Sequence, residues 1–113
     1  LGRQRRRFPS ILMKLQELIT EVRDDKLNKD QLMGYDNELH NLRAKLRLEL
    51  AELKKEKALF MVRRDAGITV SSRKEEWDAT PRGQRKFEIE SYIGVVGDLL
   101  SSIKTRLYNT YEG

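Results

Sequence analysis

The 113-residue sequence has no cysteine, only two prolines and seven glycines, and few aromatic side chains, which make up 7% of it. The absence of cysteine excludes disulfides, thiolate-ligated zinc and thiol catalysis. No apolar run approaches the ~20 residues that a helix needs to cross a bilayer, and no secretory h-region follows the N-terminal arginines. We therefore expect a soluble, cytoplasmic protein without a membrane span.

The sequence also offers little for catalysis. Its single histidine, His40, has no cysteine partner and no metal-ligand spacing around it, so we interpret it as a solvated or interface side chain. Carboxylates are frequent, but between Lys45 and Lys57 they alternate with lysines, as on exposed, ion-paired helix faces. No glycine-rich phosphate loop is present. We expect a protein that is not an enzyme and that binds neither a metal nor a cofactor.

Charge and helical periodicity are abundant instead. Charged residues make up 36% of the chain and hydrophobic residues 38%, a balance typical of long, solvated helices. Apolar residues between Phe8 and Val22 recur at steps of three and four, which predicts an amphipathic helix over about residues 10–25. A longer stripe of near-heptad spacing, from Leu32 to Phe60, predicts a helix over about residues 29–65. Asn28 and Gln31 have the spacing of a capping box at its start.

The last third of the sequence predicts a loop and another long helix. The β-branched, serine-rich run Ile68–Ser72 favours a loop over residues 66–80, with Gly67 as the stop of the preceding helix. Thr80 and Pro81 suit the N-cap and first turn of a helix over residues 81–110. Strict heptad spacing in that helix is shown by Ile89, Ile93, Val96, Leu100, Ile103 and Leu107. Within it, Gly94 and Gly97 predict the close approach of another helix or, alternatively, a subunit interface.

Together these patterns predict an all-α fold. The helices over 29–65 and 81–110 would fold back on each other as a long antiparallel hairpin that resembles a coiled coil, with an additional N-terminal helix over its open end. The 29–65 helix would be roughly 55 Å long, so it must protrude, pack along another long helix or join a neighbouring subunit. We expect a homo-oligomer whose chain has a basic N-terminal arm, residues 1–10, and a single helical domain, residues 11–113.

The net charge of +5 is unevenly distributed along the chain. Residues 1–10 carry four arginines and no acid, while residues 63–86 carry seven basic residues against four acidic ones. We call the basic residues of the second segment the basic tip: Arg63, Arg64, Arg73, Lys74, Arg82, Arg85 and Lys86. Such local excesses of one charge indicate contacts with an anionic partner.

We interpret the basic tip as a binding site for single-stranded nucleic acid. Basic side chains for the phosphates, with the flat ring of Trp77 for a base, are the usual components of such a site. Further phosphate contacts are predicted for Arg5, Arg6 and Arg7 of the arm. The alternatives are a solvated, targeting or tag-derived arm, and a Trp77 that packs on the end of the hairpin among solvated charges. Without a base-reading motif, binding to DNA or RNA should be salt-sensitive and sequence-tolerant.

Two segments of the chain carry a resemblance to a known family. From Leu50 to Gly67 the sequence reads LAELKKEKALFMVRRDAG, and after the loop and Trp77 it resumes, reading LSSIKTRL from Leu100 to Leu107. A long charged helix thus ends in a basic segment and a glycine, and a later helix closes on Ile-Lys-x-Arg. This order resembles the UvsY-type phage recombination mediators over roughly residues 35–107.

The resemblance implies a ring-forming oligomer that binds single-stranded DNA, helps to load a RecA-like recombinase and displaces single-strand binding protein. The basic positions that match are Lys57, Arg63, Arg64, Lys104 and Arg106. The family has a tyrosine pair before the glycine where this chain has Asp65 and Ala66, which removes a possible stacking platform.

The expected function is therefore that of a single-stranded nucleic-acid-binding accessory protein. Its expected protein partner is a recombinase or a single-strand binding protein. The alternative is a helical protein-interaction module, such as an adaptor, a scaffold or an inhibitor of a host enzyme, which docks its basic tip on an acidic protein surface and binds no nucleic acid.

Overall fold

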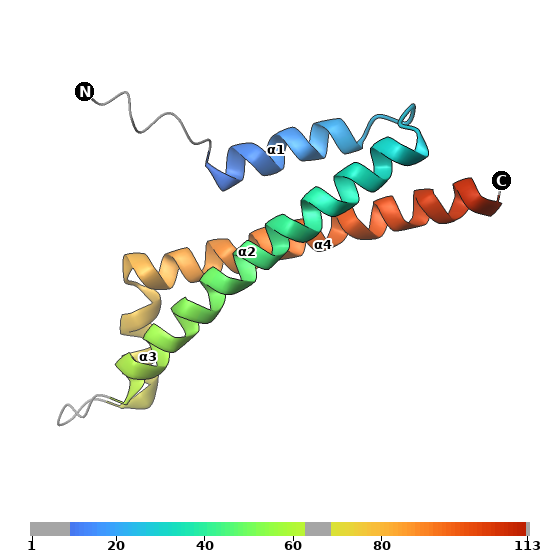
Figure 1. Cartoon of the computed structure of the whole chain (residues 1–113). Coiled ribbons are helices and arrows are strands. Elements are labelled where there is room, and N and C mark those ends of the chain that lie inside the picture. The colour runs from blue at the N-terminus through green and yellow to red at the C-terminus, as the bar shows by residue number, and fades with distance from the viewer. Residues whose placement is uncertain (1–9, 63–68, 113) are drawn as a thin grey trace. The chain divides into compact units, whose positions relative to one another are not determined.

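The computed structural model describes residues 10–62 and 69–112, which are helical apart from short connections. The helices are α1 (Ile11–Val22), α2 (Lys29–Met61), α3 (Val70–Asp78) and α4 (Pro81–Glu112) (Figure 1). The described residues contain no strand, so the predicted all-α class is confirmed. In this part of the chain, none of the helices combines the length and the apolar character needed to cross a membrane.

The starts of three helices are set by side chains that the sequence singles out. At α2 the predicted capping box is present, because Gln31 N donates to Asn28 Oδ1 at 2.8 Å and Asn28 N donates to Gln31 Oε1 at 2.9 Å. Thr80 caps α4 by accepting a hydrogen bond from Gly83 N at 3.0 Å, and Ser10 caps α1 in the same way. These side chains satisfy N–H groups that have no partner within the helix.

The loop predicted over residues 66–80 is wrong where the structure describes it, because α3 occupies Val70–Asp78. Thr69 caps this helix by accepting a hydrogen bond from Ser72 N at 3.1 Å. Helix propensities differ by less than about 1 kcal/mol per residue, so packing outweighs the poor propensity of the serines. The predicted stop at Gly67 and the predicted end of the second helix at residue 65 lie outside the described residues. Helix α1 ends at Val22, earlier than the predicted residue 25.

Contacts divide the chain into two compact units, whereas the sequence predicts one helical domain. Unit 1 consists of the described residues up to Leu42 together with those from Val95 onward, and unit 2 of those within Arg43–Gly94. Unit 1 therefore contains α1, the first part of α2 and the last part of α4. Unit 2 contains the rest of α2, α3 and the first part of α4.

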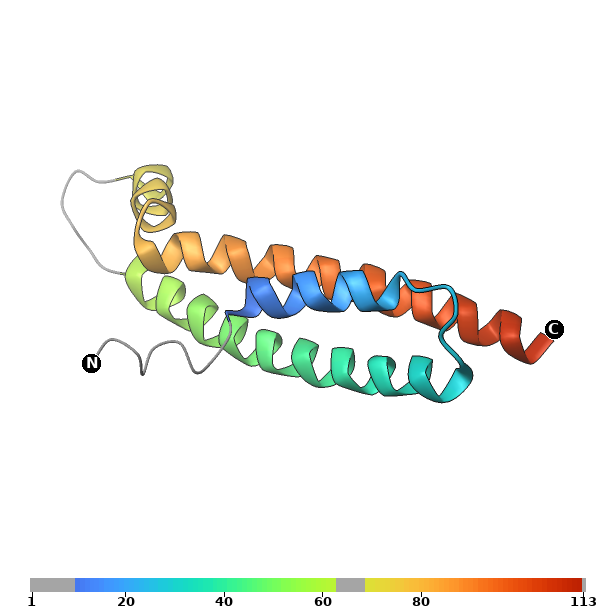
Figure 2. The same cartoon turned by 90° about the horizontal axis from the view of Figure 1, so that it is seen from above.

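Unit 1 is a three-helix cluster in which α1 lies along the parts of α2 and α4 that belong to this unit (Figures 1 and 2). Its buried apolar side chains come from all three helices and are Leu15, Leu18, Val22, Leu32, Leu39, Val96, Leu100 and Ile103. Lys14 of α1 pairs with Glu38 of α2 at 2.7 Å. The guanidinium of Arg106 donates to the backbone carbonyls of Val22 and Asp24, which caps the end of α1.

Unit 2 is held by a small apolar core and by ion pairs. Leu46 and Leu53 of α2 and Ile89 of α4 are fully buried. Arg82 at the start of α4 pairs with Glu56 of α2, and Arg85, further along α4, pairs with Glu49, which lies earlier in α2. These two helix segments therefore run antiparallel. In Figure 2, α3 is seen nearly end-on while α4 lies lengthwise, which shows that α3 runs across the start of α4.

The close approach predicted at Gly94 and Gly97 is not found in the described chain. A Cβ added at either glycine would meet no heavy atom within 4 Å. The prediction of a neighbouring helix within the chain is therefore wrong, and the alternative of a subunit interface stays a prediction.

We expect Gly94→Ala to raise the free energy of unfolding by about 0.5–1 kcal/mol, because alanine loses less backbone entropy in a helix and the added methyl group has open space. Urea unfolding followed by far-ultraviolet circular dichroism measures the change. A loss of stability would instead indicate that another subunit contacts Gly94.

Candidate nucleic-acid interface

The described part of the basic tip lies on α3 and at the start of α4, in unit 2. Arg73 and Lys74 belong to α3, while α4 carries Arg82, Arg85 and Lys86. A tight turn connects the two helices, in which the N–H of Thr80 donates to the Trp77 carbonyl at 2.9 Å and its hydroxyl donates to the same oxygen at 2.6 Å. Arg63 and Arg64 of the tip, and Arg5, Arg6 and Arg7 of the arm, lie outside the described residues.

One face of α3 packs against the end of α2. Arg73 is buried, and its Nη1 donates to the carbonyl oxygen of Met61, the last residue of α2, at 3.0 Å. The last carbonyls of a helix lack partners within it and carry partial negative charge, so the guanidinium caps α2. One turn further on, the Trp77 ring lies 5.8 Å from the Phe60 ring, centroid to centroid, with a tilt of 49°. Arg73 and Trp77 therefore attach α3 to α2.

This position decides between the two interpretations of Trp77. The side chain is only 5% exposed, so its ring is not available to stack on a base in this structure. The Trp77 ring packs against Phe60 instead, which agrees with the alternative interpretation that Trp77 serves for packing. A role in stacking would require the ring to leave its contact with Phe60.

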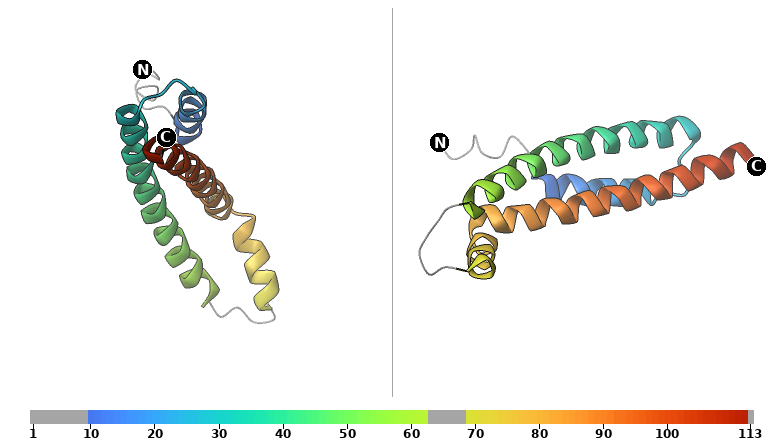
Figure 3. Two further views of the ribbon diagram at one scale, coloured as in Figure 1. Left: turned by 90° about the vertical axis from the view of Figure 1, so that its right-hand side faces the viewer. Right: turned by 90° about the horizontal axis from the view of Figure 1, so that it is seen from below.

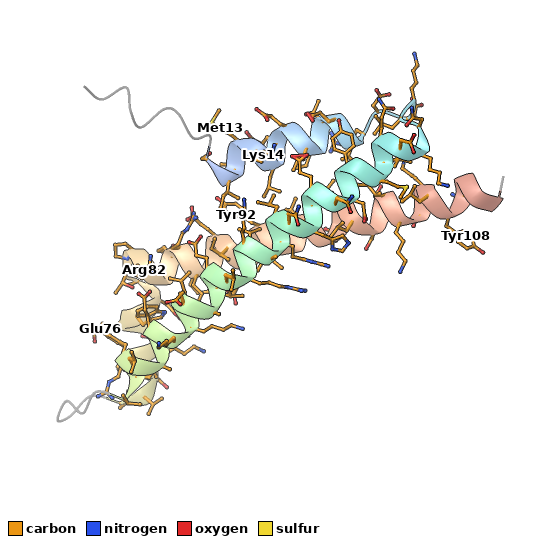
Figure 4. All side chains as sticks on the ribbon, viewed as in Figure 1. Met13, Lys14, Glu76, Arg82, Tyr92 and Tyr108 are labelled. Atoms are coloured by element: carbon orange, nitrogen blue, oxygen red, sulfur yellow. The ribbon has the colours of Figure 1, made fainter. Side chains whose placement is uncertain are left out.

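Two arginines of the basic tip bind carboxylates of α2. Arg82 holds both oxygens of Glu56, with Nε at 2.9 Å from Oε1, and the hydrogen bonds from Arg82 lower the pKa of the Glu56 carboxyl. Arg85 donates to both oxygens of Glu49, from Nε to Oε2 at 2.6 Å and from Nη2 to Oε1 at 3.2 Å. These hydrogen bonds raise the pKa of the Arg85 guanidinium. Such paired, charge-assisted hydrogen bonds fix the geometry of the two helices. Arg82 remains half exposed and accessible to solvent (Figure 4).

The exposed side chains of this surface include one aromatic ring. Phe87 is 46% exposed, and the Nζ of Lys86 lies 5.8 Å from the centroid of its ring. Lys86 also pairs with Glu90 at 3.2 Å. Lys74 is exposed and forms no ion pair with the residues that the structure describes. The sequence places Phe87 beside two basic residues, but it does not show that this ring, unlike that of Trp77, reaches solvent.

Positive charge is concentrated in unit 2. The described residues of unit 2 include 11 basic and 8 acidic ones, a net charge of +3. Residues 10–42 and 95–113 together have 6 basic and 9 acidic residues, a net charge of −3. An anionic partner would therefore be attracted to unit 2 and to the arginines of the arm.

Unit 1 has two features of chemical interest. His40 is half exposed and lies 3.6 Å from the Asp36 carboxylate, one turn away on α2. A hollow along α1 has a volume of about 400 Å³ and is lined by Met13, Gln16, Glu17, Thr20 and Glu21. Among the residues that the structure describes, no three histidine or carboxylate side chains are placed to share a metal ion.

These observations define an all-α protein with one acidic and one basic helical unit. A scan against protein-family models finds no match to the chain, and searches of curated proteins and of solved structures find none either. The function therefore has to be inferred from the charges and exposed side chains of the chain itself.

Proposed function

We propose that the chain is a sequence-tolerant accessory protein that binds single-stranded nucleic acid through unit 2, and that it is not an enzyme. The observation that supports this function best is the division of charge, with a net +3 on the described residues of unit 2 against −3 on those of unit 1. Lysines and arginines bind nucleic acid by replacing the counterions of the phosphates, which requires no base-specific geometry.

In this proposal the phosphates contact Lys74, the exposed part of Arg82, and Arg63 and Arg64. Phe87 takes the stacking role that the sequence assigns to Trp77, because its ring reaches solvent and lies beside a lysine. Stacking of a base on an aromatic ring is worth about 1–3 kcal/mol and tolerates any base. The arginines of the arm would add further phosphate contacts.

The more specific parts of the proposal rest on the resemblance to UvsY-type mediators. We propose that α2 and α4 form one long antiparallel hairpin, that the chain assembles into a homo-oligomer, and that it helps to load a RecA-like recombinase on single-stranded DNA. The segments from Leu50 to Gly67 and from Leu100 to Leu107 support these statements.

A second candidate function is a helical protein-interaction module. It is favoured by the carboxylate partners of Arg82, Arg85 and Lys86, which already neutralise much of the charge of the basic tip. Such a module would bind one protein tightly. Its binding to oligonucleotides would not increase with the length of the oligonucleotide.

We expect a labelled single-stranded oligonucleotide to bind the protein with an affinity that falls steeply with salt. Changing Arg63, Arg64 and Lys74 to alanine should weaken binding at least about tenfold and flatten the log–log salt slope by about 2, since each phosphate contact contributes about 0.7. Phe87→Ala should weaken binding about tenfold through lost stacking. Arg73 is not substituted in this variant, because its guanidinium caps α2 and its loss would disturb the fold. Fluorescence anisotropy at several salt concentrations measures both effects.

Matched controls come from unit 1. Changing Arg23, Lys26 and Lys29 to alanine removes the same charge from exposed positions there, and Tyr108→Ala removes an exposed ring from α4 (Figure 4). Both should leave binding nearly unchanged. Equal losses in the two sets would contradict the assignment of the site to unit 2. Absence of binding by the unaltered protein at low salt would overturn the function and favour the protein-interaction module.

A further inference from the structure

Helix α2 carries a second heptad pattern on the side that faces solvent in unit 2. Its buried side contributes Leu46 and Leu53 to the core. On the opposite side, side chains at steps of 4, 3, 4, 3 and 4 are all exposed, the last of them on the turn residue that follows α2. We call them the outer seam: Ala44, Leu48, Ala51, Lys55, Ala58 and Val62. Because 18 residues make five turns of α-helix, the two ends of this seam lie on the same side. The spacing is that of a coiled-coil interface.

Two side chains of the outer seam are large, apolar and exposed. Leu48 is 71% exposed and Val62 70%, and Leu59, which lies beside Ala58, is 61% exposed. In Figure 3, α3 and α4 lie on one side of the unit 2 part of α2, and no other helix of unit 2 lies on its other side. The pattern also has a defined start, because Asn37 and Asn41 are polar and continue the same spacing toward the N-terminus. The apolar seam is thus confined to the part of α2 that belongs to unit 2 and to Val62, which follows it.

The charges that flank the outer seam indicate what covers it. With Leu48 at a heptad a position, Glu52 lies at e and Arg47 at g, and both are exposed. Neither forms an ion pair with another described residue. In a parallel pair of helices, a g residue lies near the e residue five positions later on the other helix. Arg47 would then meet Glu52 of the partner subunit, and two-fold symmetry would form this contact twice.

An antiparallel pair would have less favourable charges. In that arrangement g positions face g positions, so Arg47 and Lys54 would lie beside the same two residues of the partner subunit. Like charges in such positions are repulsive. The outer seam is therefore complementary to a second copy of itself in the parallel orientation.

We infer that the outer seam is the interface of a parallel two-stranded coiled coil between two copies of this chain. Its three alanines let the helices approach closely but bury little area, and Lys55 at an a position favours one register at a cost in stability. The association should accordingly be reversible and concentration-dependent. It would place the positive charge of two copies of unit 2 side by side. The inference names an interface for the proposed homo-oligomer, but it does not depend on nucleic-acid binding.

Cysteine cross-linking tests the orientation directly, because the natural chain has no cysteine. Ala44→Cys and Val62→Cys place single thiols at the two ends of the seam, roughly 27 Å apart along the helix. In the parallel dimer each variant forms disulfide-linked dimers on its own under mild oxidation, since each residue meets its own copy. In an antiparallel dimer only a mixture of the two variants would cross-link, which would overturn the inference. Ser101→Cys, on the exposed side of α4, is the control that should not cross-link.

Sedimentation equilibrium without nucleic acid tests the interface itself. We expect the mass of the natural chain to rise from 13.3 kDa toward twice that value with concentration. Leu48→Glu should raise the dissociation constant at least tenfold while the helical content stays unchanged, because this side chain is mostly exposed in the monomer. Leu12→Glu makes the same change at an exposed position of α1 and should leave association unaltered.

Exchanging the charges of Arg47 and Glu52 tests whether the molecule that covers the outer seam is a second copy of this chain or a different protein. Arg47→Glu and Glu52→Arg should each weaken association, and the double variant should restore it, because both partners carry both changes. A monomeric mass at every concentration up to about 1 mM would overturn the inference and leave the seam to a different protein. If the natural chain dimerises but binds no oligonucleotide at low salt, the result counts only against the proposed function.

Discussion

Replacing Trp77 by alanine should lower the free energy of unfolding by about 3–5 kcal/mol, as for other buried aromatic side chains. The ring is 5% exposed, packs against Phe60 and anchors α3 to the end of α2. Its removal leaves a cavity beside the Phe60 ring, where α3 packs against α2. Urea unfolding followed by circular dichroism gives the free energy.

The control for this prediction is Trp77→Phe. A phenylalanine keeps an aromatic ring against Phe60, and it removes the indole N–H, which is buried and has no hydrogen-bond partner in the described part of the chain. An unpaired buried donor costs about 1–3 kcal/mol, so this gain offsets much of the lost area. We expect Trp77→Phe to be far less destabilising than Trp77→Ala. Equal effects of the two substitutions would show that the ring does not pack as described.

The same pair of variants tests the role of Trp77 in binding. If Trp77→Phe is folded and binds oligonucleotides as the natural protein does, the indole serves for packing and Phe87 remains the stacking candidate. If it loses binding while Phe87→Ala does not, Trp77 must leave Phe60 when nucleic acid binds.

The second large effect is expected at Gly83, in the first turn of α4. A Cβ at this position would collide with the carbonyl oxygen of Trp77 and would lie only 2.8 Å from the Cα of Asp78. These are backbone atoms at the end of α3, so they can move only if α3 is displaced from α4. Overpacking typically costs 1–3 kcal/mol, and we expect Gly83→Ala to destabilise the chain by about 3 kcal/mol.

Gly34→Ala is the matched control for Gly83→Ala. It adds the same methyl group to α2 at an exposed position where nothing lies within 4 Å, so the better helix propensity of alanine should raise stability by up to about 1 kcal/mol. The two substitutions should thus have opposite signs in urea unfolding. A Gly83→Ala protein as stable as the natural one would contradict the close contact between α3 and α4.

Local patterns in the sequence determined much of the secondary structure. The capping box of Asn28 and Gln31 and the N-cap at Thr80 could be predicted because each depends on residues only three positions apart. The heptad residues Ile89, Val96 and Ile103 are fully buried, as their spacing predicts. Helix α3 was missed because its first turn, Val70–Ser72, has weak helix propensity, and because the contacts of Arg73 and Trp77 with the end of α2 that hold it are not visible in the local sequence.

For the candidate site, the sequence by itself determined where positive charge is concentrated, because charge belongs to each residue whatever the fold. Only the tertiary structure decided which of these side chains remain accessible. It buries Arg73 and Trp77, pairs Arg82 and Arg85 with carboxylates of α2, and leaves Phe87 exposed. Burial and ion pairing depend on residues 12 to 36 positions apart in the chain, which only packing brings together.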